Sequence, residues 1–204
     1  MTGKQHAARK LGRPRSEEAG RAILEAARAL VLEHGYAGVT TRMIAEAAGT
    51  GKQTIYRRWS GKPELILDAF VAHAQERIDL PASGDEPIEA ALTAFLTRLF
   101  AALAETGPAV RGLMAYAQGD ARFRAALMER LIGPRRAALR AILEAGVRRG
   151  ELPKSADLDT TVTALYGAMW YRLMLDEPLD APFAASLARF ALAGLMRPVA
   201  RRRI

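Results

Sequence analysis

The stretch HGYAGVTTRMIAEAAGTGKQTIYRRWSGKPEL, residues 34–65, decides how the rest of the chain is interpreted. It holds two short helical patterns, TRMIAEAA and KQTIYRRW, separated by the turn-forming segment 49–51. Ile55 and Trp59 in the second pattern are four residues apart, so both can face a core. The other side chains of this pattern are polar, aromatic or basic: Lys52, Gln53, Thr54, Tyr56, Arg57 and Arg58. Two short helices joined by a glycine-containing turn, the second with a basic outer surface, are typical of a helix-turn-helix.

Positive charge is concentrated in the first third of the chain. Residues 1–62 carry twelve Lys and Arg against five Asp and Glu, a balance of +7, whereas residues 63–204 carry eighteen against seventeen, a balance of +1. This asymmetry indicates a small module that binds a polyanion, joined to a larger and nearly neutral domain. A basic surface that only aids solubility is the alternative, and the excess of Arg over Lys, 25 to 5, can also reflect coding bias.

Helical periodicity extends over nearly the whole chain, and no segment alternates apolar and polar residues as strands do. We therefore predict an all-α fold. The first helix begins at Ser16, a favourable N-cap, and stops at Gly35. After the two short helices, a fourth starts near Lys62 and runs to about residue 79. Further helices are expected at 87–106, 109–118, 120–131, 134–149, 157–175 and 181–197, with a break or kink at Gly133-Pro134.

These helices divide the chain into three parts. A basic flexible arm is expected at 1–15, and a helix-turn-helix domain of three helices at 16–62. A larger helical domain for ligand binding and dimerisation is expected at 63–204.

At residues 34–65 the chain resembles the tetracycline-repressor (TetR) family of transcriptional regulators. The shared pattern consists of Gly-Tyr followed by Thr-Thr, an Ile-Ala-x-x-Ala-Gly run, a Thr-x-Tyr motif and a Lys at the start of the next helix. The resemblance implies that KQTIYRRW is the recognition helix. The chain departs from the family at Gly51, where Ser is frequent, and at Thr50, where an aliphatic residue is frequent. A weaker N-cap and the loss of one hydroxyl contact are expected from this departure.

The resemblance also implies which residues contact double-stranded DNA. Thr41 and Arg42 would contact the backbone or a base from the first short helix, and Lys62 would hold a phosphate. The remaining contact surface would consist of Thr50, Gly51, Lys52, Gln53, Thr54, Tyr56, Arg57 and Arg58.

A second basic element, LGRPRS at 11–16, precedes the first helix. Because proline disfavours helix for the residue before it, we expect an extended segment here. Its Arg13 and Arg15 could enter a narrow minor groove of the DNA. A leader with incidental charge explains the same residues equally well.

The last two predicted helices carry wide apolar faces. Two apolar helices at the end of a chain can each need two burial partners, and a four-helix bundle formed with a second copy across a two-fold axis supplies them. Such a homodimer would read a palindromic operator with two recognition helices. The alternative is that both helices cover the core of their own chain. The predicted interface residues are Val162, Leu165, Tyr166, Met169, Leu173, Phe183, Leu187, Phe190 and Leu195.

The resemblance continues through VRGLMAYAQGDARFRAALMERLIGPRRAALRAIL and LYGAMWYRLML, and implies a small-molecule effector that the sequence does not name. By the same resemblance, the bound effector would favour an arrangement of the two recognition helices that no longer matches the operator, as in a repressor. A stripe of Met and aromatic residues belongs more often to a core than to a pocket, so core packing is the alternative for each predicted pocket residue. These residues are Phe95, Leu99, Met114, Tyr116, Gln118, Phe123, Trp170, Tyr171 and Met174.

Several other classes of protein are not indicated. The chain has no Cys, and its three His are never four residues apart, so no zinc site and no cofactor are expected. No hydrolase, P-loop or dinucleotide-binding motif is present, so we do not expect an enzyme. Without a signal-peptide core or a long apolar run, we expect a soluble, cytoplasmic protein with no membrane partner. A DNA-binding regulator or architectural protein without an effector remains the alternative function.

Overall fold

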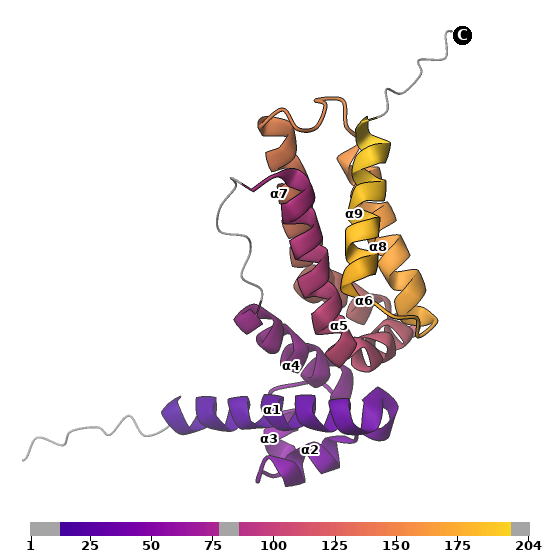
Figure 1. The fold of residues 1–204 in the computed structure, drawn as a ribbon. Coiled ribbons are helices and arrows are strands. Elements are labelled where there is room, and N and C mark those ends of the chain that lie inside the picture. Colours follow the sequence, from indigo (N-terminus) through magenta and orange to yellow (C-terminus); the bar gives the residue numbers. More distant parts are fainter. Residues whose placement is uncertain (1–12, 78–85, 197–204) are drawn as a thin grey trace, which may run out of the picture. The chain divides into compact units, whose positions relative to one another are not determined.

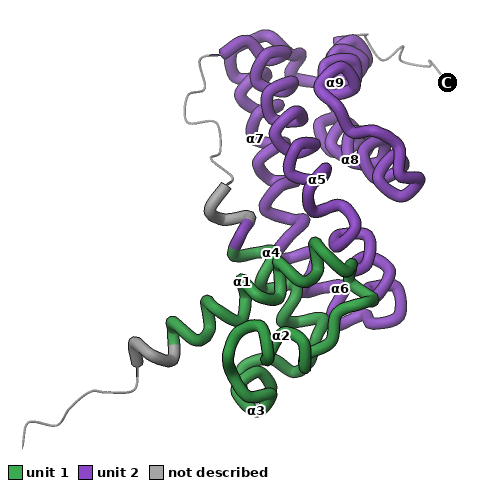
Figure 2. The backbone as a smooth tube through the Cα atoms, turned by 60° about the horizontal axis from the view of Figure 1, so that its bottom comes forward, with its two compact units in different colours: residues 1–72 green, residues 73–204 purple. Residues whose placement is uncertain are grey.

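The computed structural model describes residues 13–77 and 86–196, and every regular element within these ranges is helical (Figure 1). The all-α fold is therefore confirmed. The chain forms two compact units, unit 1 at residues 1–72 and unit 2 at residues 73–204 (Figure 2). The division falls within the fourth helix rather than before it. The start of this helix is tied to unit 1, because Asp68 accepts a hydrogen bond from the indole N–H of Trp59 at 2.9 Å.

Unit 1 contains helices α1 (Arg13–Gly38), α2 (Thr41–Ala47) and α3 (Lys52–Tyr56), and most of α4 (Lys62–Arg77). α1 packs against α2, and α2 packs against α3. One face of α1 is apolar and is buried at Ile23, Ala27 and Val31. These side chains, with those of α2, α3 and α4, give a unit of this size a core of its own.

α1 begins at Arg13 rather than at Ser16, so residues 13–15 are helical and not extended as predicted. Proline is tolerated in a first helical turn, because the N–H groups there have no partner within the helix. The side chains of Arg13 and Arg15, and all of residues 1–12, lie outside the described residues, so their contact with the minor groove stays a prediction. At the other end, Gly35 leaves the helical conformation with φ 71°, close to the predicted stop.

Unit 2 is built around α5 (Ile88–Gly119), which packs against α6 (Ala121–Leu127), α7 (Gly133–Arg148), α8 (Leu158–Met174) and α9 (Ala181–Met196). α8 and α9 lie side by side in Figure 1 and are also in contact. The core between these helices is apolar and includes Phe100, Leu139, Leu143, Leu165 and Leu192. The ring of Phe100 stacks on that of Phe183 from α9, with centroids 5.6 Å apart.

The break expected between 87–106 and 109–118 is absent, because α5 runs through Pro108 as one helix. Pro108 is exposed, whereas its neighbours Gly107, Ala109 and Val110 are buried. Burial on both sides of the proline offsets the cost of the lost backbone hydrogen bond. A Cβ added at Gly107 would lie 2.9 Å from Cδ1 of Leu173, so glycine lets α5 approach α8 closely.

The helix does not break at Gly133-Pro134 either. A π-helical segment, η1 (Met128–Ile132), joins α6 to α7, and Pro134 lies in the first turn of α7, where it is tolerated. A Cβ added at Gly133 would lie 2.8 Å from the carbonyl oxygen of Met128. The close approach of that carbonyl explains why glycine occupies this position.

Candidate nucleic-acid interface

The turn between α2 and α3 is set by local hydrogen bonds and by glycine. Thr40 caps α2, since its Oγ1 accepts a hydrogen bond from the N–H of Met43 at 3.2 Å. Gly49 has φ 61°, a conformation that favours glycine. Gly51 is the N-cap of α3 and makes no side-chain hydrogen bond there, which agrees with the weak cap expected from the sequence.

The inner side of α3 anchors the helix in unit 1. Ile55 and Trp59 are 0% and 6% exposed, as their spacing predicted. The helix itself is shorter than the predicted KQTIYRRW, since α3 ends at Tyr56 and Trp59 lies in the segment that follows it. The backbone N–H of Ser60 then donates to the carboxylate of Glu64 at 2.8 Å, which fixes the step into α4. The outer side of α3 is therefore presented by a helix whose inner side is fully packed.

The outer side carries most of the predicted contact residues. Lys52 and Arg57 are exposed, and neither has an acidic partner within 13–77 or 86–196. Arg42 is exposed on α2 but forms an ion pair with Glu46, Nε to Oε1 at 2.7 Å. Among the other predicted contact residues, four are exposed, namely Gly51, Gln53, Tyr56 and Arg58, and four are half-buried, namely Thr41, Thr50, Thr54 and Lys62. We use the name basic face for the exposed residues Arg42, Gly51, Lys52, Gln53, Tyr56, Arg57 and Arg58.

A hydrogen bond joins α2 to α3 at the edge of the basic face, between Thr41 and Tyr56. Oγ1 of Thr41 and Oη of Tyr56 lie 3.0 Å apart, and either hydroxyl can donate. Tyr56 is 56% exposed, so this bond orients a ring that is otherwise held by little packing. Two of the four hydroxyl side chains predicted to contact DNA therefore lie together.

Lys62 has a structural task that the sequence did not indicate. Its Nζ donates to the carbonyl oxygens of Tyr36 at 2.9 Å and Val39 at 3.0 Å, and lies 4.5 Å from the centroid of the Tyr36 ring. Burial lowers the pKa of this amine below its ordinary value. Two of its three N–H groups are used in holding the end of α1, so at most one is left for a phosphate.

Arg58 is also turned toward its own unit. A Cβ added at Gly20 would lie 2.8 Å from Nη1 of Arg58, so the guanidinium lies over α1 where glycine leaves space for it. No motif in the sequence reveals this contact, because it joins residues far apart in the chain. Lys52, Arg57 and Arg42 are consequently the cations that the basic face presents most openly.

Comparisons with known proteins relate each of the two units to a known domain. Residues 23–69 match the family model described as bacterial regulatory proteins, tetR family. Residues 85–191 match the model of the tetracyclin repressor-like C-terminal domain. The chain belongs to the TetR family. It is therefore a DNA-binding transcriptional regulator and not an enzyme, in agreement with the function expected from the sequence.

Individual relatives agree with this assignment. The uncharacterised regulator YdeS of Bacillus subtilis is 35% identical over 84% of this chain and 87% of its own length. A protein of Mycobacteroides abscessus named DNA-binding transcriptional repressor TetR is 31% identical over 92% of this chain and 98% of its own. Among solved structures, the TetR-family transcription regulator SCO0332 matches with a TM-score of 0.72 and 28% identity, covering 88% of this chain and all of that one.

The residues predicted for the effector pocket of this TetR-family chain differ widely in exposure, and the pocket stays a prediction. Tyr171 and Met174 are 64% and 45% exposed, and Gln118 is exposed with its amide bonded to the carbonyl of Met114. Tyr171 follows the buried Met169 by two residues, about 200° around the helix, so it faces away from the core. The others are core or surface residues: Phe95 and Phe123 are buried, Leu99, Met114 and Trp170 are half-buried, and Tyr116 is exposed.

The interface residues predicted on α8 and α9 mostly face the core of their own chain, which was the alternative left open. Helical periodicity identifies an apolar face but not the chain that buries it. Phe190 differs, since it is 77% exposed. Of the other eight, Phe183 and Leu195 are half-buried, and six are buried: Val162, Leu165, Tyr166, Met169, Leu173 and Leu187.

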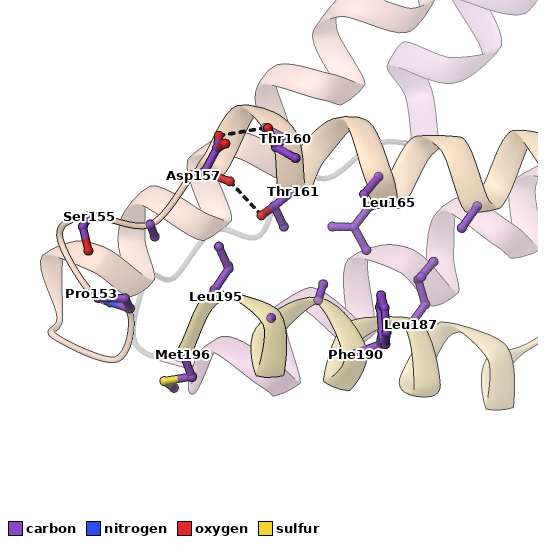
Figure 3. A pocket seen from close by; sticks show the side chains of 15 residues that line it. Pro153, Ser155, Asp157, Thr160, Thr161, Leu165, Leu187, Phe190, Leu195 and Met196 are labelled. Carbon is purple, nitrogen blue, oxygen red and sulfur yellow. Dashed lines mark hydrogen bonds between the residues drawn. The ribbon is translucent and has the colours of Figure 1, made fainter. Parts of the chain in front are cut away.

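A groove of about 480 Å³ runs between α8 and α9 of this TetR-family chain on the outside of that core (Figure 3). One wall is formed by Asp157, Thr160 and Thr161, which are held by hydrogen bonds of 3.0 and 2.8 Å. The other wall carries Phe190 and Leu195. None of the nine predicted pocket residues lines this groove.

Residues 13–77 and 86–196 contain neither a metal-binding cluster nor a membrane-spanning helix. No cluster of three or more His, Asp or Glu side chains suited to a metal ion occurs there. Each helix in these ranges is too short or too polar to cross a lipid bilayer.

Proposed function

We propose that this chain is a homodimeric repressor, working in the cytoplasm, which binds a palindromic operator through the basic face and leaves it when a small molecule binds unit 2. The observation that carries the proposal is the pair of exposed cations, Lys52 and Arg57, on a helix whose inner side is anchored by Ile55 and Trp59. Exposed, unpaired cations on a rigid helix are suited to phosphates and base edges.

The groove between α8 and α9 supports a dimer. Phe190 beside it is too large and too exposed to be explained by the folding of one chain. A second copy related by a two-fold axis would offer the same groove and the same phenylalanine, so each copy could cover that of the other. The proposed interface is thus the outer surface of α8 and α9, not the buried faces.

The repressor role rests on a relative. The Mycobacteroides abscessus protein, 31% identical over nearly its whole length, is named a DNA-binding transcriptional repressor. Release by an effector would follow if the effector favours an arrangement that separates the two basic faces by a distance other than the half-site spacing.

Binding to DNA upstream of this protein's own gene and its neighbouring genes tests the main proposal. Fluorescence anisotropy at near-physiological salt should show one fragment bound about a thousandfold more tightly than scrambled DNA. Equal and steeply salt-dependent binding to every fragment would contradict a sequence-specific repressor and favour an architectural role.

The dimer is tested by sedimentation of the wild type and of Phe190→Glu. The wild type should sediment as a dimer and the variant as a monomer with unchanged helix content, because Phe190 is outside the core. Ala141→Glu, at an exposed position of α7, is the matched control and should remain dimeric. A wild-type monomer, or a dimer that survives Phe190→Glu, would overturn the proposed interface.

A further inference from the structure

The hydroxyl of Tyr166 on α8 is buried and has no hydrogen-bond partner within residues 13–77 and 86–196. The residue is 6% exposed, and its Oη is completely enclosed. Buried polar groups in native proteins are almost always hydrogen-bonded, so an exception calls for an explanation. Burial raises the pKa of Tyr166 to about 12, and the hydroxyl is therefore a proton donor at neutral pH.

Two arginines from the first turn of α7 lie close to this tyrosine. The guanidinium carbon of Arg136 is 5.8 Å from the centroid of the Tyr166 ring, and its Nη2 donates to Oγ1 of Thr163 at 3.4 Å. Arg135 is half-buried, and the charges of both arginines act on the Tyr166 hydroxyl. A neutral donor and two cations thus converge where α7 meets α8.

Neither arginine has an acidic partner in the part of unit 2 that the structure describes. Arg135 makes one hydrogen bond, from Nη1 to the carbonyl oxygen of Leu131 at 2.5 Å, and burial lowers its pKa. Arg140, one turn further along α7, instead forms ion pairs with Glu144 and Asp159. Burying an unpaired cation is unfavourable, so an anion bound to Arg135 would stabilise this part of unit 2.

The backbone at this position is unusual as well. The carbonyl that Arg135 contacts belongs to η1, and π-helical turns occur frequently at functional sites. The same turn is where a Cβ at Gly133 would meet the carbonyl of Met128. The π-helical turn thus sets the position from which the two arginines extend.

We propose that Arg135, Arg136 and Tyr166 bind the carboxylate of a small organic acid, and that this acid is the effector. A guanidinium binds a carboxylate through two parallel hydrogen bonds, and a tyrosine hydroxyl can donate a third. The anion would pair the half-buried Arg135 and give the Tyr166 hydroxyl its missing acceptor, once the side chains that enclose this hydroxyl move apart. The role as effector rests on the proposed function, whereas the binding of a carboxylate does not.

Isothermal titration of the full chain without DNA tests the binding itself. The probes are acetate, hexanoate and benzoate, with hexanol, benzyl alcohol and inorganic phosphate as comparisons. At least one carboxylate should bind with saturation below about 1 mM, while its alcohol, which lacks the charge, should bind at least about tenfold more weakly. No saturation by any carboxylate up to 10 mM, or equal binding of phosphate, would overturn the proposal.

Three variants locate the site. Tyr166→Phe removes one oxygen and should weaken the carboxylate about tenfold while the protein stays folded, since the lost hydroxyl had no partner. Arg135→Gln should weaken it at least as much, and Arg148→Gln, an exposed arginine of the same helix, should leave it unchanged. Unchanged binding in Tyr166→Phe would overturn the assignment even if Arg135→Gln failed to fold.

Two further measurements separate this inference from the proposed function. Sedimentation of Arg135→Gln should still show a dimer, because a lost dimer would mean that an acid of the second copy is the true partner of Arg135. Anisotropy with the operator should show release by the carboxylate that binds. Binding of the carboxylate without release of DNA would support the site but reject its role as the effector site. Release of DNA by compounds whose binding does not depend on Arg135 would reject this site and leave the proposed function intact.

Discussion

The two units use positive charge in different ways. In unit 2, some of the arginines are paired with acids, as in Arg111 with Asp176 at 2.7 Å and Arg172 with Glu177 at 3.5 Å. In unit 1, Lys52 and Arg57 are exposed without an acidic partner among the described residues. A cation that is already paired attracts a polyanion little, while an unpaired one retains its full attraction. Whether a cation is paired with an acid is therefore a better indication of a DNA-binding surface than the number of cations.

The exceptions make the same distinction. Lys62 lies in unit 1 but is bound to two backbone carbonyls, while its contact with a phosphate stays a prediction. Arg135 and Arg136 lie in unit 2 and have no acidic partner among the described residues, and they are the cations for which we propose a ligand. What a cation touches thus separates its function from its location in the chain.

The largest expected effect is on the inner side of α3. Trp59→Ala should lower the free energy of unfolding of unit 1 by about 3–5 kcal/mol, because it removes a buried ring and leaves Asp68 without its indole donor. Urea denaturation measures this loss, and DNA binding should fall with it. Tyr171→Ala, which removes an exposed ring in unit 2, should cost under about 0.5 kcal/mol. Similar costs for the two variants would show that α3 is not anchored as described.

The next largest effect is a loss of operator affinity with little change in the free energy of unfolding. Arg57→Ala should weaken operator binding by about 1–3 kcal/mol and change the free energy of unfolding by less than about 0.5 kcal/mol. Fluorescence anisotropy and urea denaturation of the same samples measure the two quantities. Arg148→Ala, an exposed arginine of unit 2, should alter neither. Equal losses of affinity in both variants would mean that net charge, and not the basic face, drives binding.

Lys62 should show the opposite pattern. Lys62→Met should reduce the free energy of unfolding by about 1–2 kcal/mol, because two charged hydrogen bonds to carbonyls are lost. At temperatures well below unfolding, operator affinity should fall less than in Arg57→Ala. Thermal unfolding and anisotropy together test this, and a variant of normal stability that no longer binds DNA would return Lys62 to the role predicted from the sequence.

The smallest effect is confined to acid. The backbone N–H of Ile88, at 2.7 Å, and the side chain of Arg149 hold the pKa of Glu151 below its ordinary value of 4.5. Its contribution to stability is therefore present above pH 4.5 and is lost as the pH falls through the lowered pKa. Urea midpoints between pH 6 and 3 should decline less steeply in Glu151→Gln. Glu129→Gln, an exposed control, should keep the wild-type profile, and identical profiles for all three proteins would contradict this linkage.

Local signals in the sequence predicted unit 1 well. The spacing of Ile55 and Trp59 and the glycines of the turn each act over a few residues, so they can be recognised without the fold. The task of Lys62 could not be predicted, because its partners at Tyr36 and Val39 are backbone carbonyls more than twenty residues away.

Unit 2 was predicted less well for a related reason. Pro108 predicted a break, yet burial of its neighbours keeps α5 continuous, and that burial depends on four other helices. The apolar faces of α8 and α9 were recognised, but their partner in packing was not. Tyr166 was assigned to an interface, although its enclosed hydroxyl becomes visible only once α7 is in place.

Gly107 has a consequence for how this sequence can drift under selection. With Cδ1 of Leu173 only 2.9 Å from where its Cβ would stand, this position should reject every larger residue in a library screened for folded protein. Gly167 and Gly194 have nothing within 4 Å of such a Cβ and should accept alanine in the same screen. If the library is instead selected for repression in cells, Gly194, which lines the groove, should lose that tolerance while Gly119 keeps it. The difference between the two screens would test, position by position, the surface that we propose a second chain covers.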